Sequence, residues 1–187
     1  MRKTILFIVV SAIFLTACGA QEDNAETDDR IQIAVTTTFL YDMVSVLEED
    51  VDHFKLELII PAGEDPHVYQ PKASDLRKIN ESDFILYQGL NFEGRMIDLL
   101  ETGIPVADDL DTSSLETMEE DGVAEVDPHF WFNIDLYKEA MTNVFNILTE
   151  MNPDGEAAYQ DNLNAYFEEL DELDDYVSDR IEEVPRE

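Results

Sequence analysis

The sequence predicts an α/β fold with a parallel sheet, followed by one long helix. Short β-branched runs alternate with segments of helical periodicity, and strands that alternate with helices usually pair in parallel. Near the end of the chain, apolar side chains recur every three or four positions without interruption. With 187 residues and 44% hydrophobic content, the chain can bury a core.

The expected elements follow one another in a regular order. Ile31 to Val35 alternates like a strand, and Thr36 to Thr38 supply caps for the helix that follows. The acidic stretch 108–126 has no clear periodicity and is expected to be a surface loop or insertion. Strands are predicted at 31–35, 54–60, 84–87 and 104–107, and helices at 39–47, 73–80, 93–101 and 134–151.

After a turn at 152–155, the apolar stripe from Tyr159 to Val184 predicts a helix of roughly thirty residues, about 45 Å long. Taken alone, the same spacing also fits one strand of a coiled coil.

The first eighteen residues have the pattern of a targeting signal. Arg2 and Lys3 precede an apolar run, 5–15, that is too short to span a membrane. The ending Leu-Thr-Ala-Cys resembles the lipobox of bacterial lipoproteins, with Cys18 as the lipidated residue; the alternative is an ordinary signal peptide that ends near a cysteine. We therefore expect a signal peptide at 1–17, a lipidated cysteine with an acidic tether at 18–30, and anchoring on the extracytoplasmic face of a Gram-positive cell membrane.

Composition excludes several classes of function. The chain has 44 acidic and 11 basic residues, a net charge of −33, which argues against binding nucleic acid. Its single cysteine can form neither an internal disulfide nor a thiolate metal cluster. Most of the carboxylates are expected to face solvent, and none is singled out as a ligand.

Two Asp-Pro-His tripeptides carry the chemistry of the sequence. They place His67 behind Asp65 and His129 behind Asp127. Proline restricts the backbone of each approach, and the aspartate can accept the second ring N–H and so fix the imidazole tautomer. Neutral imidazoles bind Zn²⁺, Mn²⁺ or Fe²⁺, so the repeat predicts a metal site with His67 and His129 as ligands.

The third histidine and the aromatic residues beside His129 are assigned structural roles and not roles as ligands. A lone loop histidine is usually solvated or hydrogen-bonded in a core, and His53 is assigned that role. Phe130 and Trp131 are expected to form core or pocket wall.

Longer motifs resemble those of the metal-binding lipoproteins of bacterial ABC importers, the adhesin-like or zinc-solute-binding family. The resemblance runs from about residue 31 to 184, and its motifs are TTT with DMV at 36–44, PAGEDPHVYQP at 61–71, SDL at 74–76, YQGL and FEG at 87–94, and DPHFWFN at 127–133. It implies two α/β lobes joined by a rigid helix, with the metal held in the cleft by two histidines of the first lobe, whose positions His67 and His129 match.

The second lobe, which the resemblance implies should supply a third and a fourth ligand, is absent from this sequence. We expect a metal-binding lobe at 31–152, a linking helix at 153–184 and half a coordination shell completed by water. With only half of its ligands, this chain alone is expected to bind the metal weakly.

The resemblance implies a monomeric receptor that delivers Mn²⁺ or Zn²⁺, with Fe²⁺ as a further option, to an ABC permease in the cytoplasmic membrane, and that is not an enzyme. The 108–126 segment contains no histidine, which favours Mn²⁺ over Zn²⁺ because zinc-dedicated members often carry a histidine-rich loop. The alternatives are a surface adhesin with a structural metal and a metallohydrolase, for which the sequence has no HExxH motif.

Overall fold

A four-stranded, fully parallel sheet forms the centre of the computed structural model, which describes residues 28–120 and 123–185. The predicted signal peptide, Cys18 and most of the tether lie outside the described residues. The strands occur in the order β2-β1-β3-β4, and their bounds are β1 Ile31–Val35, β2 Phe54–Leu58, β3 Phe84–Tyr87 and β4 Ile104–Pro105. The predicted parallel α/β architecture is confirmed.

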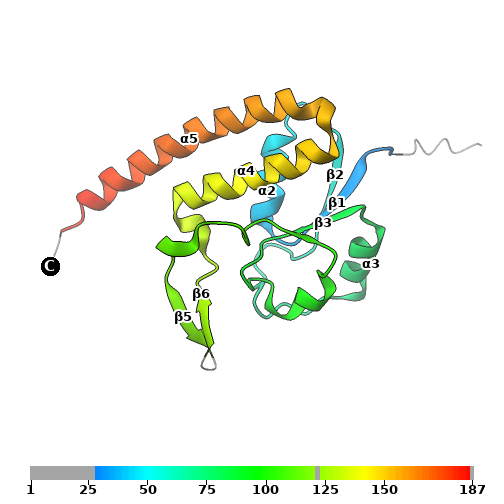
Figure 1. Ribbon diagram of the computed structural model, residues 1–187, viewed down its shortest axis with the longest axis horizontal. Helices are drawn as coiled ribbons and strands as arrows, with labels where there is room; N and C mark the ends of the chain where they lie inside the picture. The colour runs from blue at the N-terminus through cyan, green and yellow to red at the C-terminus, as the bar shows by residue number, and fades with distance from the viewer. Residues whose placement is uncertain (1–27, 121–122, 186–187) are drawn as a thin grey trace, which may run out of the picture.

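Alternate residues of the central strands pack on opposite faces of the sheet, because successive side chains of a strand point to opposite sides. Ile33 and Val35 join the larger apolar cluster, which the helices α2, α4 and α5 cover. Ala34 and Ile85 join a smaller cluster on the face of α3. The result is three layers, with α3 on the other side of the sheet from α4 and α5 (Figure 1).

Each of the shorter helices begins where the sequence offers a cap. In α2 (Thr38–Leu47), the Thr37 hydroxyl accepts a hydrogen bond from the Leu40 N–H, at 3.3 Å. In α4 (Ile134–Met151), the Asn133 side chain caps the first turn. The third, α3 (Ala73–Glu81), is capped by Asp75, which accepts from the Lys72 N–H at 2.8 Å.

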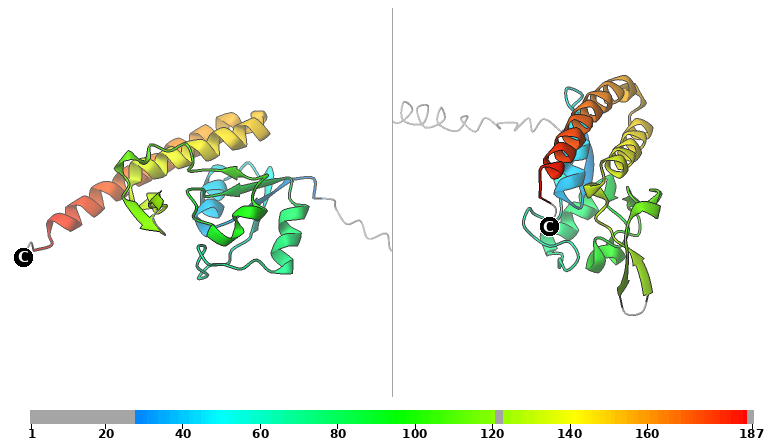
Figure 2. Two further views of the ribbon diagram at one scale, coloured as in Figure 1. Left: turned by 60° about the horizontal axis from the view of Figure 1, so that its bottom comes forward. Right: turned by 90° about the vertical axis from the view of Figure 1, so that its left-hand side faces the viewer.

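The long terminal helix α5 (Glu156–Glu182) is packed along only part of its length. Tyr159, Leu163 and Leu170 are buried in the main core, whereas every residue from 171 to 185 is exposed. Figure 2 shows α5 running beside α4 and then continuing past it. The predicted long helix is confirmed, and its first half packs on α4 and α2 of the same chain.

The structure refines one expectation from the sequence and corrects another. The segment 108–126, expected to be a surface loop or insertion, contains an antiparallel hairpin, β5 (Thr117–Glu120) and β6 (Val123–Val126), which follows the 3-10 turn η3 (Thr112–Ser114) and projects from the body (Figure 1). The helix expected at 93–101 is a 3-10 helix, η2 (Gly94–Leu99). Strands β2 and β4 are each two residues shorter than predicted. No helix within residues 28–120 and 123–185 is long and apolar enough to cross a bilayer.

Candidate metal site

The two Asp-Pro-His tripeptides adopt the same local turn. Asp65 Oδ1 accepts a hydrogen bond from the His67 backbone N–H at 3.0 Å, and Asp127 Oδ1 accepts from the His129 backbone N–H at 3.0 Å. An aspartate that bonds the backbone two residues ahead fixes an Asx turn. The Asx turn therefore holds the backbone of each histidine in a defined conformation.

The fold brings the two predicted ligands together. The ring centroids of His67 and His129 are 5.4 Å apart. Two imidazoles bound to one metal through nitrogens at about 2.1 Å have ring centroids roughly 5 Å apart. The observed spacing is thus close to the spacing of a shared metal ion.

The two aspartates differ in what else they contact. Asp127 Oδ1 also lies 2.5 Å from Nδ1 of the His129 ring, so Nε2 is the nitrogen left to a metal. The backbone N–H and the ring of His129 together hold the pKa of Asp127 below its usual range. Among the described residues, the hydrogen bond of Asp65 is to the backbone of His67 and not to its ring.

An aromatic wall supports the imidazoles. The Phe92 ring is 3% exposed and meets the His67 ring edge-on at 4.8 Å and the His129 ring at 5.9 Å. Trp131 lies 5.1 Å from His129 and stacks on Phe39 of α2 at 4.5 Å. Trp131 therefore belongs to the wall, as predicted, and Phe130 is buried in the core.

The two histidines reach the site from different sheets. His67 lies in the loop after β2, at the carboxyl edge of the parallel sheet, where ligands bind in such folds. His129 instead follows β6 of the hairpin. Its loop is tied to the parallel sheet by Gln88, which follows β3 and donates from Nε2 to the Pro128 carbonyl at 3.4 Å.

The paired imidazoles are the candidate metal ligands that the fold brings together. Within residues 28–120 and 123–185, no group of three or more His, Cys, Asp or Glu side chains is arranged to hold a metal ion. His53 precedes β2, and its ring lies edge-on to Phe54 at 4.9 Å. It therefore stands at the opposite end of that strand from His67.

Sequence reasoning gave no role to Gln88, Phe92 or Glu93, which lie in the YQGL and FEG motifs. Glu93 is fully buried and contacts the ends of two strands. With 44 acidic residues in the chain, only burial distinguishes it. The motifs at 87–94 could have indicated that these residues lie near the site, because they come at the end of a strand at the same sheet edge as the first tripeptide.

A parallel α/β lobe with two adjacent imidazoles at its carboxyl edge and a long helix behind it defines the metal-receptor class of solute-binding proteins. Residues 33–187 match the family model of the zinc-uptake complex component A, periplasmic. The chain belongs to this family.

Named relatives and solved structures agree with this assignment. The chain is 29% identical over 201 residues to the manganese ABC transporter substrate-binding lipoprotein PsaA of Streptococcus pneumoniae, covering 100% of this chain and 64% of that protein. It is 30% identical over 195 residues to the manganese-binding lipoprotein MntA of Halalkalibacterium halodurans, covering 100% of this chain and 63% of that protein. The chain thus spans somewhat less than two thirds of the length of these curated relatives.

Among solved structures, a TroA chain studied for its metal-binding specificity superposes with a TM-score of 0.78 at 43% identity, over 83% of this chain and 56% of that one. The periplasmic zinc-binding protein TroA of Treponema pallidum gives a TM-score of 0.75 at 26% identity, over 83% and 57%.

Proposed function

We propose that this protein captures a divalent transition metal ion outside the cytoplasm and delivers it to the membrane permease of an ABC importer. The observation that carries the proposal is the pair of imidazoles, His67 and His129, 5.4 Å apart at the carboxyl edge of the sheet. The name of the PsaA relative, a substrate-binding lipoprotein of a manganese ABC transporter, and that of MntA, a manganese-binding lipoprotein, support a receptor that is not an enzyme.

In this mechanism the cargo is coordinated and released without any change in covalent bonds. His129 binds through Nε2 while Asp127 holds its tautomer, and His67 supplies the second nitrogen. Water, or groups outside the described residues, complete the coordination shell. We propose Mn²⁺ as the cargo and Zn²⁺ as its stronger competitor, since nitrogen ligands bind Zn²⁺ more tightly than Mn²⁺.

The proposed cargo site is tested by replacing each histidine with alanine and titrating the metal-free protein with Zn²⁺ in a calorimeter. We expect His67→Ala and His129→Ala each to weaken binding more than about tenfold, because half of the nitrogen ligands are lost. His53→Ala is the matched control, and its binding should equal that of the unmodified chain. If the His67 and His129 variants bind Zn²⁺ as tightly as the unmodified chain, the proposal is overturned.

We further propose that Cys18 is lipidated and anchors the protein on the outer face of the membrane, beside its permease. The lipobox pattern supports this, and so do relatives that are named lipoproteins. Labelling of the expressing cells with an alkyne fatty acid should mark the unmodified protein and leave Cys18→Ser unlabelled. Equal labelling of the two proteins would contradict the anchor.

A further inference from the structure

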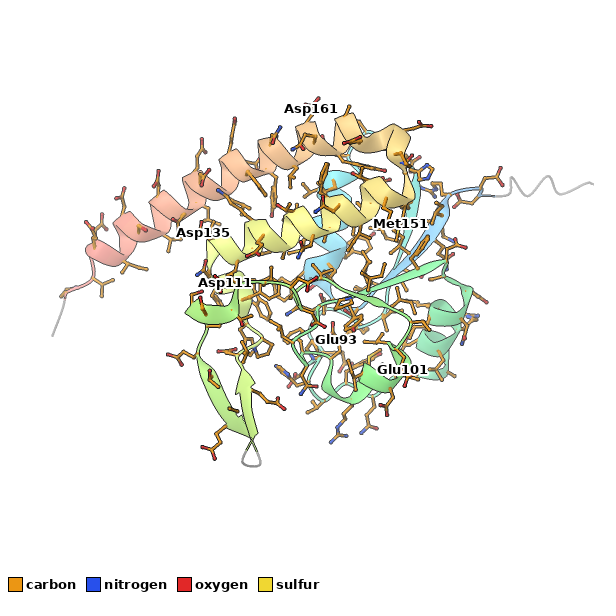
Figure 3. All side chains as sticks on the ribbon, in the orientation of Figure 1. Glu93, Glu101, Asp111, Asp135, Met151 and Asp161 are labelled. Carbon is orange, nitrogen blue, oxygen red and sulfur yellow. The ribbon has the colours of Figure 1, made fainter. Side chains whose placement is uncertain are left out.

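One buried carboxylate joins the sheet to the wall of the site. Glu93 is fully buried, and Figure 3 shows it in the interior of the molecule. Its carboxylate accepts hydrogen bonds from the Thr36 hydroxyl at 2.6 Å, the Gln88 N–H at 2.7 Å and the Gly89 N–H at 3.3 Å. These donors directly follow β1 and β3, so the carboxylate ties together the carboxyl ends of the two central strands.

Such a group needs an explanation, because taking a carboxylate out of water costs several kcal/mol before its partners compensate. Burial raises the pKa of Glu93 although hydrogen bonds, that of the Thr36 hydroxyl foremost, act to lower it. An apolar side chain could fill the same volume without this cost.

The residues on either side of Glu93 both contact His67. Phe92 places its ring edge-on against the His67 ring and also lies beside the His129 ring. On the other side, a Cβ added to Gly94 would lie 2.7 Å from the His67 carbonyl oxygen, so a side chain there would displace the loop. The segment 92–94 therefore packs against the His67 ring and lies close to its backbone.

The turn that leads into this segment is strained. Gly89, Leu90 and Asn91 have consecutive positive φ angles of 90°, 52° and 59°. A left-handed conformation costs an ordinary L-residue about 1–2 kcal/mol. It persists only where its surroundings hold it in place. Two carboxylates do so here: Glu93 accepts from the Gly89 N–H at the start of the turn, and Asp108 accepts from the Leu90 N–H at 3.0 Å.

We infer that Glu93 is a positioning residue for the metal site: through Phe92 and Gly94 it holds the two imidazoles at their metal-binding spacing before any metal arrives. The inference rests on the proposed function, since the spacing matters only if the imidazoles share an ion. Without this anchor the strained turn relaxes, Phe92 moves, and part of the binding free energy is spent in ordering the histidines.

The chain provides a closely matched control for a test. Glu48, at the end of α2, likewise accepts two backbone N–H groups, those of His53 and Phe54, and one hydroxyl, that of Tyr159. Replacing either glutamate by glutamine disturbs an equivalent set of hydrogen bonds. Only Glu93 lies beside residues that contact the two predicted ligands, His67 and His129.

The experiment compares Glu93→Gln with Glu48→Gln in the same chain. The probes are Zn²⁺ titration by calorimetry, thermal unfolding, and NMR signals of the histidine rings in the metal-free protein. Both variants should unfold at lower temperature. We expect Glu93→Gln alone to weaken Zn²⁺ binding about tenfold and to shift or broaden the ring signals of His67 and His129. Should Glu93→Gln fail to fold, Thr36→Val removes one hydrogen bond to the carboxylate and should act in the same direction.

Unperturbed ring signals and unchanged Zn²⁺ affinity in a folded Glu93→Gln or Thr36→Val protein would overturn the inference. The same effect on affinity and ring signals from Glu48→Gln would also overturn it. The proposed function fails separately, if His67→Ala and His129→Ala bind Zn²⁺ as the unmodified chain does. In that event the ring signals of the metal-free variants still decide whether Glu93 positions the imidazoles.

Discussion

The hydrogen bond between Asp127 and the His129 ring should contribute measurably to metal affinity, and the chain contains its own control. Asp127→Asn and Asp65→Asn each keep an oxygen that can accept the backbone N–H of the Asx turn. Only Asp127 also contacts the imidazole, at 2.5 Å from Nδ1. The difference between the two variants therefore isolates the bond to the ring.

The size of the effect follows from the exposure of the pair. A hydrogen bond to a charged group contributes about 1.5–3 kcal/mol, and asparagine retains a neutral bond of about 1 kcal/mol. The His129 side chain is 37% exposed, so solvent screening reduces the expected difference to about 1 kcal/mol. That corresponds to a roughly fivefold weaker affinity for Zn²⁺.

Titration with Zn²⁺ at pH 7.5, followed by calorimetry or by the histidine ring signals in NMR, gives the affinities directly. Asp127→Asn should bind about fivefold more weakly, and Asp65→Asn should bind like the unmodified chain. Equal affinities for all three proteins would refute the reasoning. An equal loss in both variants would show that the Asx turn matters and the ring contact does not.

Two further predictions concern stability. Gly89→Ala should lower the free energy of unfolding in urea by about 3 kcal/mol, because its φ is 90° and its Cβ would lie 2.4 Å from Asp108 Oδ1. Gly63→Ala is the control: its φ is 89° but its Cβ would meet open space, so the loss should be only about 1 kcal/mol. Equal losses in the two variants would contradict this prediction. Burial acts to raise the pKa of Asp75, but hydrogen bonds, the Lys72 N–H foremost, outweigh it and hold this pKa below its usual range. Its stabilisation is present above the unfolded-state pKa near 4 and is lost as pH falls through the lower native value, so Asp75→Asn should cost about 2 kcal/mol at pH 7 and little near pH 2. A loss that does not change with pH would oppose that assignment.

The parts of the fold that sequence predicts well are those with clear local patterns. β1, β3 and α4 have the predicted bounds, because β-branched alternation, a cap and a regular helical stripe each act within a few residues. The hairpin at 117–126 was missed because it lies in an acidic stretch without clear periodicity, and only one of its cross-strand pairs, Thr117 with Val126, is β-branched on both strands. Asp121-Gly122 in the sequence, a common two-residue hairpin signal, could have indicated it.

The sequence predicts the candidate ligands of the site but not the residues that surround and position them. The repeated tripeptide indicates His67 and His129 as ligands, and the structure brings them together, but their role as ligands stays a prediction. Their neighbours depend on tertiary contacts: no local pattern shows that Phe92 packs against both imidazoles or that Glu93 is buried. Likewise, no local pattern shows that Asp127 contacts its histidine ring while Asp65, in an identical tripeptide, contacts only the backbone of its histidine.

The uneven packing of α5 divides one continuous helix into two thermodynamic segments. Up to Leu170, burial against the core adds to helix propensity, and opening a backbone hydrogen bond there requires breaking tertiary contacts. From residue 171 to the end of the helix every residue is exposed and half are acidic, so like charges one turn apart oppose the helix and local opening costs little. Added salt screens that repulsion. The helix therefore frays from its carboxyl end, in a manner set by ionic strength, while its buried half stays as stable as the lobe itself.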